Sequence, residues 1–156
     1  MIQRIQTLYL LAATILMALV YFMPLMTFGT IEGLATVYTY KMVDGLGIVE
    51  ATPWYLSALT LMAVVLPFGT IFRYKKRLTQ IRWCAVELVL LVGVVLMEAF
   101  YGYRFYQLFA DLSPELLAAS YKVTLLFPLV SMLFVWLAMR AIFRDEMLVK
   151  AADRIR

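Results

Sequence analysis

The stretch TLYLLAATILMALVYFMPLMTF, residues 7–28, decides the fold because it carries no charged side chain. A helix needs about 20 apolar residues to cross the hydrocarbon core of a bilayer. Three further long apolar runs follow, at 53–72, 83–103 and 122–143. The pattern predicts an all-α integral membrane protein, in which a single membrane domain over residues 1–156 forms a four-transmembrane-helix bundle.

The composition excludes most soluble and catalytic classes. Of the 156 residues, 65% are apolar and 15% are charged, whereas soluble domains average about half and about a quarter. Too few polar side chains remain to cover a soluble domain of this size. The chain has no histidine and one cysteine, which excludes an internal disulfide, a His/Cys zinc site and serine–histidine catalysis. We therefore expect no enzyme, no cofactor and no metal site.

The lysines and arginines predict how the chain crosses the membrane. Eleven of the fourteen lie at the termini or between the second and third apolar runs. These eleven are Arg4, Arg73, Lys75, Lys76, Arg77, Arg82, Arg140, Arg144, Lys150, Arg154 and Arg156, and the other three are Lys41, Arg104 and Lys122. The positive-inside rule then places both termini and the turn at 73–82 in the cytoplasm, with the loops 29–52 and 104–122 outside. This basic rim, in contact with anionic membrane lipids, accounts for the net charge of +4 without a nucleic-acid partner.

The two outer loops carry signals for local structure. Residues 35–43 are rich in β-branched and aromatic side chains, and Asp44-Gly45 follows them. With a return strand at 46–50, they predict a small β-hairpin within the first outer loop, 29–52, over the outer helix ends. In the second loop, Ser113-Pro114-Glu115 is a helix start, so the fourth helix is expected to begin near Pro114 and to enter the bilayer near Lys122.

The C-terminal tail, 144–156, continues the helical pattern of the fourth run. Met147, Leu148, Ala151 and Ile155 recur at helical spacing, and no glycine or proline interrupts them. The pattern predicts a cytoplasmic C-terminal helical extension. Two interpretations remain open, a solvated stalk or an amphipathic helix that lies on lipid or on a partner.

Glu87 is the first of two acidic residues inside the third run. A charged side chain at the centre of a membrane helix costs about 2.5 to 3.5 kcal/mol even on the lenient insertion scale. Glu87 follows Arg82 by five residues, which is about 7 Å into the membrane at the helical rise. Arg140, on the antiparallel fourth helix, lies at a similar depth. The sequence predicts an ion pair between Glu87 and Arg140, and the alternative is an inward-facing polar site.

Glu98 lies deeper along the same run. It follows Arg82 by sixteen residues, about 24 Å along the helix, and therefore falls in the outer half of the bilayer. Arg104 and Lys122 are expected within reach. A protonated or hydrogen-bonded structural glutamate is the first interpretation, and a proton- or cation-coupled site is the alternative.

Three end motifs carry a family resemblance. They are MIQRIQT at 1–7, YKKRLTQIR at 74–82, and the segment from Arg140-Ala141-Ile142 through Arg144-Asp145-Glu146 to Ala152-Asp153-Arg154. With these motifs the chain resembles the four-span membrane family of Bacteroidetes known as domain of unknown function 4293. The resemblance covers the whole chain and implies four helices in a bacterial inner membrane. It implies no reaction, and because its motifs all map to the inner face, that face is where we first look for a partner.

We expect a non-enzymatic bacterial inner-membrane protein that acts as an accessory or scaffold subunit. Its partner, another membrane or cytoplasmic protein, would bind the inner turn and the tail, where acids interspersed among bases suit a partner with charges of both signs. The candidate surface is Arg73, Lys75, Lys76, Arg77, Arg82, Arg144, Asp145, Glu146, Lys150, Asp153 and Arg154. The alternatives are a small proton- or ion-coupled transporter that uses Glu98, and a lipid-handling membrane protein.

Overall fold

The computed structural model describes residues 3–30, 33–50, 54–73, 77–112 and 119–154. The four long helices are α1 (Gln3–Phe22), α2 (Trp54–Ile71), α3 (Arg77–Leu112) and α4 (Phe127–Arg154). The five strands are β1 (Pro24–Thr30), β2 (Gly33–Tyr38), β3 (Met42–Val43), β4 (Val49–Glu50) and β5 (Ala119–Tyr121). A short 3-10 helix, η1 (Val123–Leu126), leads into α4.

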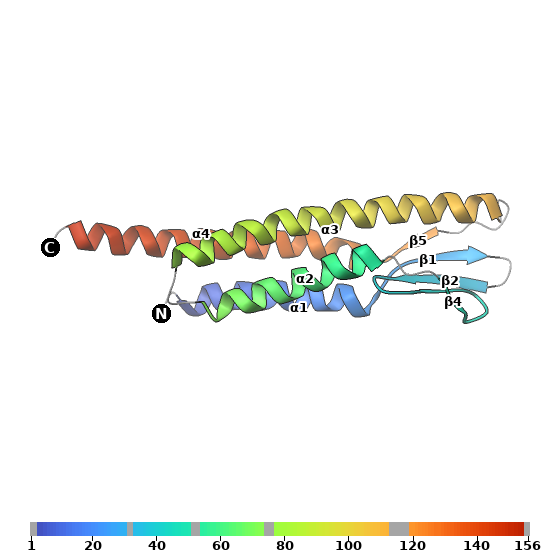
Figure 1. Ribbon diagram of the computed structural model, residues 1–156, viewed down its shortest axis with the longest axis horizontal. Helices are drawn as coiled ribbons and strands as arrows, with labels where there is room; N and C mark the ends of the chain where they lie inside the picture. Colours follow the sequence, from blue (N-terminus) through green and yellow to red (C-terminus); the bar gives the residue numbers. More distant parts are fainter. Residues whose placement is uncertain (1–2, 31–32, 51–53, 74–76, 113–118, 155–156) are drawn as a thin grey trace.

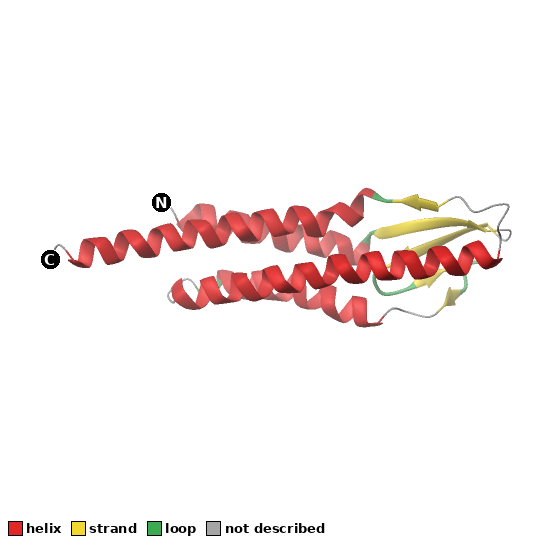
Figure 2. Cartoon of the chain, turned by 90° about the horizontal axis from the view of Figure 1, so that it is seen from above, coloured by secondary structure: helices red, strands yellow, loops and turns green. Residues whose placement is uncertain are grey.

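The helices lie side by side, and the strands gather at one end of the molecule (Figures 1 and 2). Helix α1 packs against α2 and α4, and α3 packs against the same two helices. We call the end with the strands the sheet end, and the opposite end, where α1 begins and α4 ends, the terminal end. Helix α3 extends alongside the sheet, whereas α4 projects past the other helices at the terminal end (Figure 1).

The four helices have the length and composition of membrane spans. Among the described residues, all four are long and apolar enough to cross a membrane, as the sequence predicted. Their outward faces are apolar as well, for example at Leu8, Val89 and Leu133, which are all exposed. A helix that is apolar on every side is typical of a membrane span. The structure therefore suggests a membrane protein.

The strands form one antiparallel sheet in the order β4-β3-β2-β1-β5, which is larger than the predicted hairpin. The predicted first span, 7–28, was too long, because α1 ends at Phe22 and Pro24 begins β1. Proline has no N–H to donate to a helix, and it disfavours helical backbone in the residue before it. The apolar residues after Pro24 are thus core residues of a strand, and Leu25, Met26 and Phe28 are buried.

The segment predicted as one strand, 35–43, divides in two. The Tyr38 N–H donates to the Lys41 carbonyl (2.8 Å) and closes a turn between β2 and β3. Asp44-Gly45 reverses the chain as predicted, but through a longer connection, since the Asp44 N–H bonds the Ile48 carbonyl (2.9 Å). The return strand is correspondingly short, β4 alone.

The chain enters α4 differently from the prediction. Ser113, Pro114 and Glu115, the predicted helix start, lie outside the described residues. Residues 119–121 then form β5, paired with Met26, Thr27 and Phe28 of β1, so no helix runs continuously from Pro114 into the fourth span. An edge strand has backbone N–H and C=O groups without partners. Pairing with β5 provides partners for these groups of β1, which a helix in place of β5 could not do. Helix α4 begins only at Phe127.

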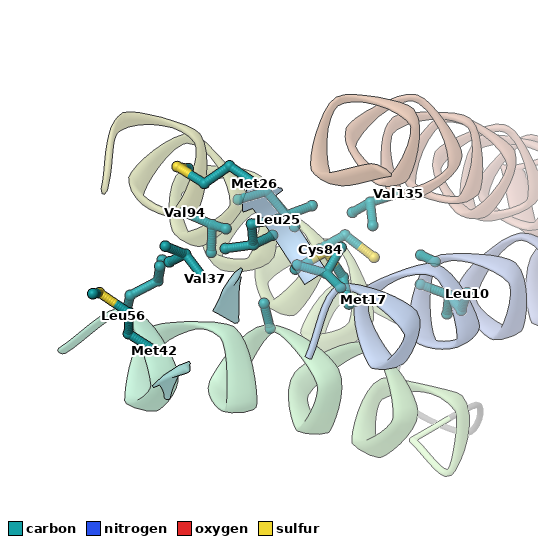
Figure 3. Packing of buried hydrophobic residues seen from close by; sticks show 14 of the residues in the cluster. Leu10, Met17, Leu25, Met26, Val37, Met42, Leu56, Cys84, Val94 and Val135 are labelled. Atoms are coloured by element: carbon teal, nitrogen blue, oxygen red, sulfur yellow. The ribbon is translucent and has the colours of Figure 1, made fainter. Parts of the chain in front are cut away.

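A continuous core joins the helices to the sheet. Met17, Cys84 and Val135 come from three different helices and belong to the same buried cluster as the sheet residues (Figure 3). At the sheet end, the rings of Phe28 and Phe109 stack with centroids 5.0 Å apart, which fixes α3 against β1. This packing makes α3, at 36 residues, a shared support for both parts of the molecule.

Candidate functional site

One face of α3 carries both acidic residues of the third apolar run. Its buried positions alternate in steps of four and three and define what we call the α3 seam: Gln80, Cys84, Glu87, Leu91, Val94 and Glu98. Such a step pattern keeps residues on one side of a helix. The exposed fractions of Glu87 and Glu98 are only 2% and 4%. The signal was present in the sequence, because a separation of eleven residues is about three helical turns.

The predicted ion pair between Glu87 and Arg140 is wrong. Both carboxyl oxygens of Glu87 are buried without a hydrogen-bond partner, and the Arg140 guanidinium lies 5.5 Å from the ring centroid of Trp136. The pair was predicted only from the similar depths of Glu87 and Arg140 along their helices. Arg140, however, is two residues from both Ala138 and Ile142, which are buried. A step of two residues turns about 200° around a helix, so Arg140 lies on the exposed side of α4.

Ser131 on α4 is a third unpartnered group, which sequence analysis missed. Among the described residues, every buried side-chain oxygen or nitrogen without a partner belongs to Glu87, Glu98 or Ser131. The guanidinium of Arg77 donates to the Asp145 carbonyl (3.2 Å), which fixes how α3 and α4 lie against each other. Leu91 follows Arg77 by fourteen residues on α3, and Ser131 precedes Asp145 by fourteen residues on the antiparallel α4. Ser131 therefore lies level with Leu91, at a height between the two glutamates.

Glu98 lines a pocket of about 490 Å³ where α3 passes the edge of the sheet. The lining residues come from α3, β1, β5 and η1, and they are Met26, Val95, Glu98, Ala99, Gly102, Tyr103, Tyr106, Tyr121 and Leu125. Gly102 leaves room for β1, because a Cβ atom there would come within 3.3 Å of the Met26 Cε. Arg104 and Lys122, which we expected near Glu98, are not among the lining residues.

The terminal end pairs its buried polar groups. The Gln6 side-chain amide of α1 donates to the Asp145 carboxylate, and Arg77 of α3 donates to the Asp145 carbonyl. The Gln80 amide donates to the Thr70 carbonyl of α2 (3.1 Å). Three hydrogen bonds therefore tie all four helices together at this end.

Asp145 is a structural residue rather than part of an exposed surface. Its exposed fraction is 8%, in contrast to its place in the predicted partner surface. Ser131, Val135, Ala138, Ile142 and Asp145 follow the same four-three spacing, and all are buried. The inward side of α4 therefore includes position 145, and the charge there is held by Gln6.

The other residues of the predicted partner surface divide into four groups. Arg73, Arg82 and Arg144 are exposed, and Arg77 and Glu146 are half-buried. Lys150, Asp153 and Arg154 belong to the last turns of α4, and Lys75 and Lys76 lie outside the described residues. Arg140 and Arg144 also line a second pocket, of about 400 Å³, between α1 and α4.

A shared metal site at the two glutamates does not fit the geometry. Glu87 and Glu98 are about 16 Å apart along the helix axis. Within the described part of the chain, no group of three or more His, Cys, Asp or Glu side chains could hold a metal ion.

These features define a protein of four apolar helices that share a core with a small antiparallel sheet and enclose a line of unpaired polar groups. The chain belongs to the family described as "Domain of unknown function (DUF4293)", whose sequence pattern it matches over residues 2–155. The resemblance inferred from the end motifs is thereby confirmed over essentially the whole chain. No curated protein matches the sequence.

Proposed function

We propose that the protein spans the bacterial inner membrane with its terminal end in the cytoplasm. Support comes from the eleven basic residues at the termini and in the 73–82 turn, against three elsewhere. Thiol labelling in a Cys84→Ala background tests the orientation, since Cys84 is buried. Leu46→Cys is expected to react from outside the cell and Leu148→Cys only after permeabilisation. The reverse pattern would contradict the proposed orientation.

We propose that this membrane protein is a non-enzymatic accessory or scaffold subunit whose partner binds the projecting part of α4. The observation that carries the proposal is that α4 continues without a break from Asp145 to Arg154. This segment extends about 14 Å past the hydrogen bonds that tie the helices together. Met147, Leu148 and Val149 are all exposed there. These three residues lie beyond the predicted span, 122–143, and consecutive exposed apolar residues are a candidate interaction surface.

A protein partner fits this segment better than a lipid surface. Its charges have both signs, with Arg144, Lys150 and Arg154 beside Glu146 and Asp153. A lipid-bound helix at an anionic membrane surface is predominantly basic on its polar side. Mixed charges instead provide complementarity with a partner that carries both signs.

Quantitative co-purification from the native membrane tests the proposal. The double change Met147→Ser/Leu148→Ser is expected to reduce the retained partner about tenfold, as for the loss of apolar anchor residues from an interface. Leu46→Ser is the matched control, because Leu46 is an exposed leucine of the sheet end. Equal partner retention by both variants would contradict a partner site on α4.

A second candidate function, a small ion-coupled carrier, is favoured by one observation. Glu98 is buried, its Oε1 has no partner, and it borders a pocket of about 490 Å³. Buried acidic residues of membrane helices often serve proton or ion pathways. Proton flux into proteoliposomes, followed with an internal pH dye, is expected to fall to the level of empty vesicles in Glu98→Gln. Flux that is unchanged in this variant would exclude the carrier.

A further inference from the structure

The pocket beside Glu98 contains an acidic group that nothing in its wall neutralises. The exposed fraction of Glu98 is 4%, and its Oε1 has no hydrogen-bond partner among the described residues. None of the described residues that line the pocket is lysine or arginine. An acidic group in such surroundings is stabilised either by a proton of its own or by a cation or hydrogen-bond donor beside it. A donor that enters the pocket from outside would meet this requirement.

Three tyrosines form the rim of the same pocket. Tyr103, Tyr106 and Tyr121 line it and are exposed, so the rim is open to the surroundings. The Tyr103 hydroxyl accepts a hydrogen bond from the Gln107 side-chain amide (2.7 Å), which holds its ring in place. The faces of aromatic rings attract ammonium groups. The rim therefore consists of a residue type that can bind the same charge that the carboxylate behind it attracts.

The remaining wall of the pocket is apolar. Met26, Val95, Ala99 and Leu125 line it. The volume of about 490 Å³ is in the range of small-molecule sites. Next to Leu125, Leu126 is exposed on the outer surface of η1, so the mouth of the pocket adjoins an apolar surface. A chain attached to the cation could continue along this surface.

We propose that the pocket binds an ammonium group carried on an apolar chain, with the ammonium against Glu98 and the chain along Met26 and Leu125. Two sources share this chemistry, the head group of an aminophospholipid and a free alkylamine. The site lies at the sheet end, so the inference does not depend on the partner surface of α4. It concerns the same pocket as the second candidate function, but it does not depend on transport, because its test measures binding.

Lipid retention by the purified protein tests the proposal. The detergent-solubilised protein is offered equal amounts of phosphatidylethanolamine and phosphatidylglycerol with identical acyl chains, and bound lipid is counted by native mass spectrometry. We expect selective retention of phosphatidylethanolamine, because only its head group carries an ammonium. Glu98→Gln is expected to reduce the selectivity about tenfold or more, as for the loss of a charge-assisted hydrogen bond.

Glu87→Gln is the matched control for that change. Glu87 is buried on the same seam of α3 but does not line the pocket. The control is expected to keep the wild-type selectivity. Equal losses in the two variants, or wild-type selectivity in Glu98→Gln, would overturn the assignment of phosphatidylethanolamine to this pocket.

Hexylammonium and hexan-1-ol distinguish the two sources, since they share a chain and differ in the ammonium group. Displacement of phosphatidylethanolamine by hexylammonium and not by hexan-1-ol assigns the site to the lipid head group. Glu98-dependent binding of hexylammonium in calorimetry, without lipid selectivity, assigns it to a free amine. Equal behaviour of the two probes together with equal retention of the two lipids would overturn the proposal.

A pocket-filling variant covers the case in which Glu98→Gln fails to fold. Leu125→Trp keeps the carboxylate and occupies the wall where the chain would lie. Its thermal unfolding shows whether the variant is folded, and the folded variant is expected to lose ammonium binding. Undiminished binding of phosphatidylethanolamine and hexylammonium by folded Leu125→Trp would overturn the proposed position of the ligand.

Discussion

The terminal end and the rest of the α3 seam differ in how their buried amide and carboxyl groups are paired. At the terminal end, the carboxylate of Asp145 receives the amide of Gln6, and the amide of Gln80 reaches the Thr70 carbonyl. Along the rest of the α3 seam and the facing helices, Glu87, Ser131 and Glu98 keep buried polar atoms without partners. Both sets occupy positions of the same four-three spacing.

The difference separates groups that stabilise the fold from groups that the fold tolerates. A satisfied buried polar group contributes to stability, and an unsatisfied one opposes it. The terminal end therefore depends on hydrogen bonds. Beyond that end, apolar packing such as the Phe28–Phe109 stack contributes to stability, and the unpaired groups are carried at a cost. We interpret the unpaired groups as retained for binding, most clearly at the Glu98 pocket.

The largest expected effect comes from the packing of the sheet end. Phe109→Ala removes a buried ring from the stack with Phe28 and should lower the free energy of unfolding by about 3 to 5 kcal/mol. Chemical unfolding in detergent micelles measures the change. Leu108→Ala is the neighbouring control, because Leu108 is exposed, and it should change stability far less. Equal effects at 108 and 109 would break the assignment of stability to this stack.

A smaller loss is expected when the terminal end loses one hydrogen bond. Gln6→Ala leaves the buried Asp145 carboxylate without its side-chain donor, which should cost about 1 to 3 kcal/mol. The unfolding midpoint of this variant is compared with that of Leu8→Ala, a change at an exposed position of the same helix. A midpoint for Gln6→Ala no lower than that of the control would mean that the terminal end does not depend on this bond.

The smallest expected changes in stability come from two buried hydroxyl groups, one paired and one unpaired. The Thr60 hydroxyl donates to the Leu56 carbonyl (2.8 Å), whereas the Ser131 hydroxyl has no partner. Thr60→Val should destabilise by about 1 kcal/mol, and Ser131→Ala should be neutral or slightly stabilising. Unfolding curves of the two variants give the comparison directly. A larger loss in Ser131→Ala would show that its hydroxyl is paired in the folded protein.

Much of the helical architecture could be predicted from the sequence, because long apolar runs are a strong local signal. The end of the first helix could have been predicted as well, since Pro24 interrupts the run. The pairing of β5 with β1 could not, because it joins residues more than ninety positions apart with no local signature. Long-range strand pairing is chosen by the packed fold and not by either segment alone.

The candidate site was predicted in part. Glu87 and Glu98 were singled out because charges are costly in an apolar run. The sequence analysis compared only how deep these residues lie along their helices. The spacing of the residues around each helix also predicts the shared face of the two glutamates and the burial of Asp145. The pocket required the structure, because four separate elements contribute its wall.

The most direct test of the contrast between paired and unpaired groups replaces one acid of each kind by an apolar residue of similar shape. Asp145→Leu removes a paired carboxylate, and Glu87→Met removes an unpaired one. The free energy of unfolding in detergent should fall by about 1 to 3 kcal/mol for Asp145→Leu and should stay level or rise for Glu87→Met. Equal losses in the two variants, or a greater loss in Glu87→Met, would contradict the account.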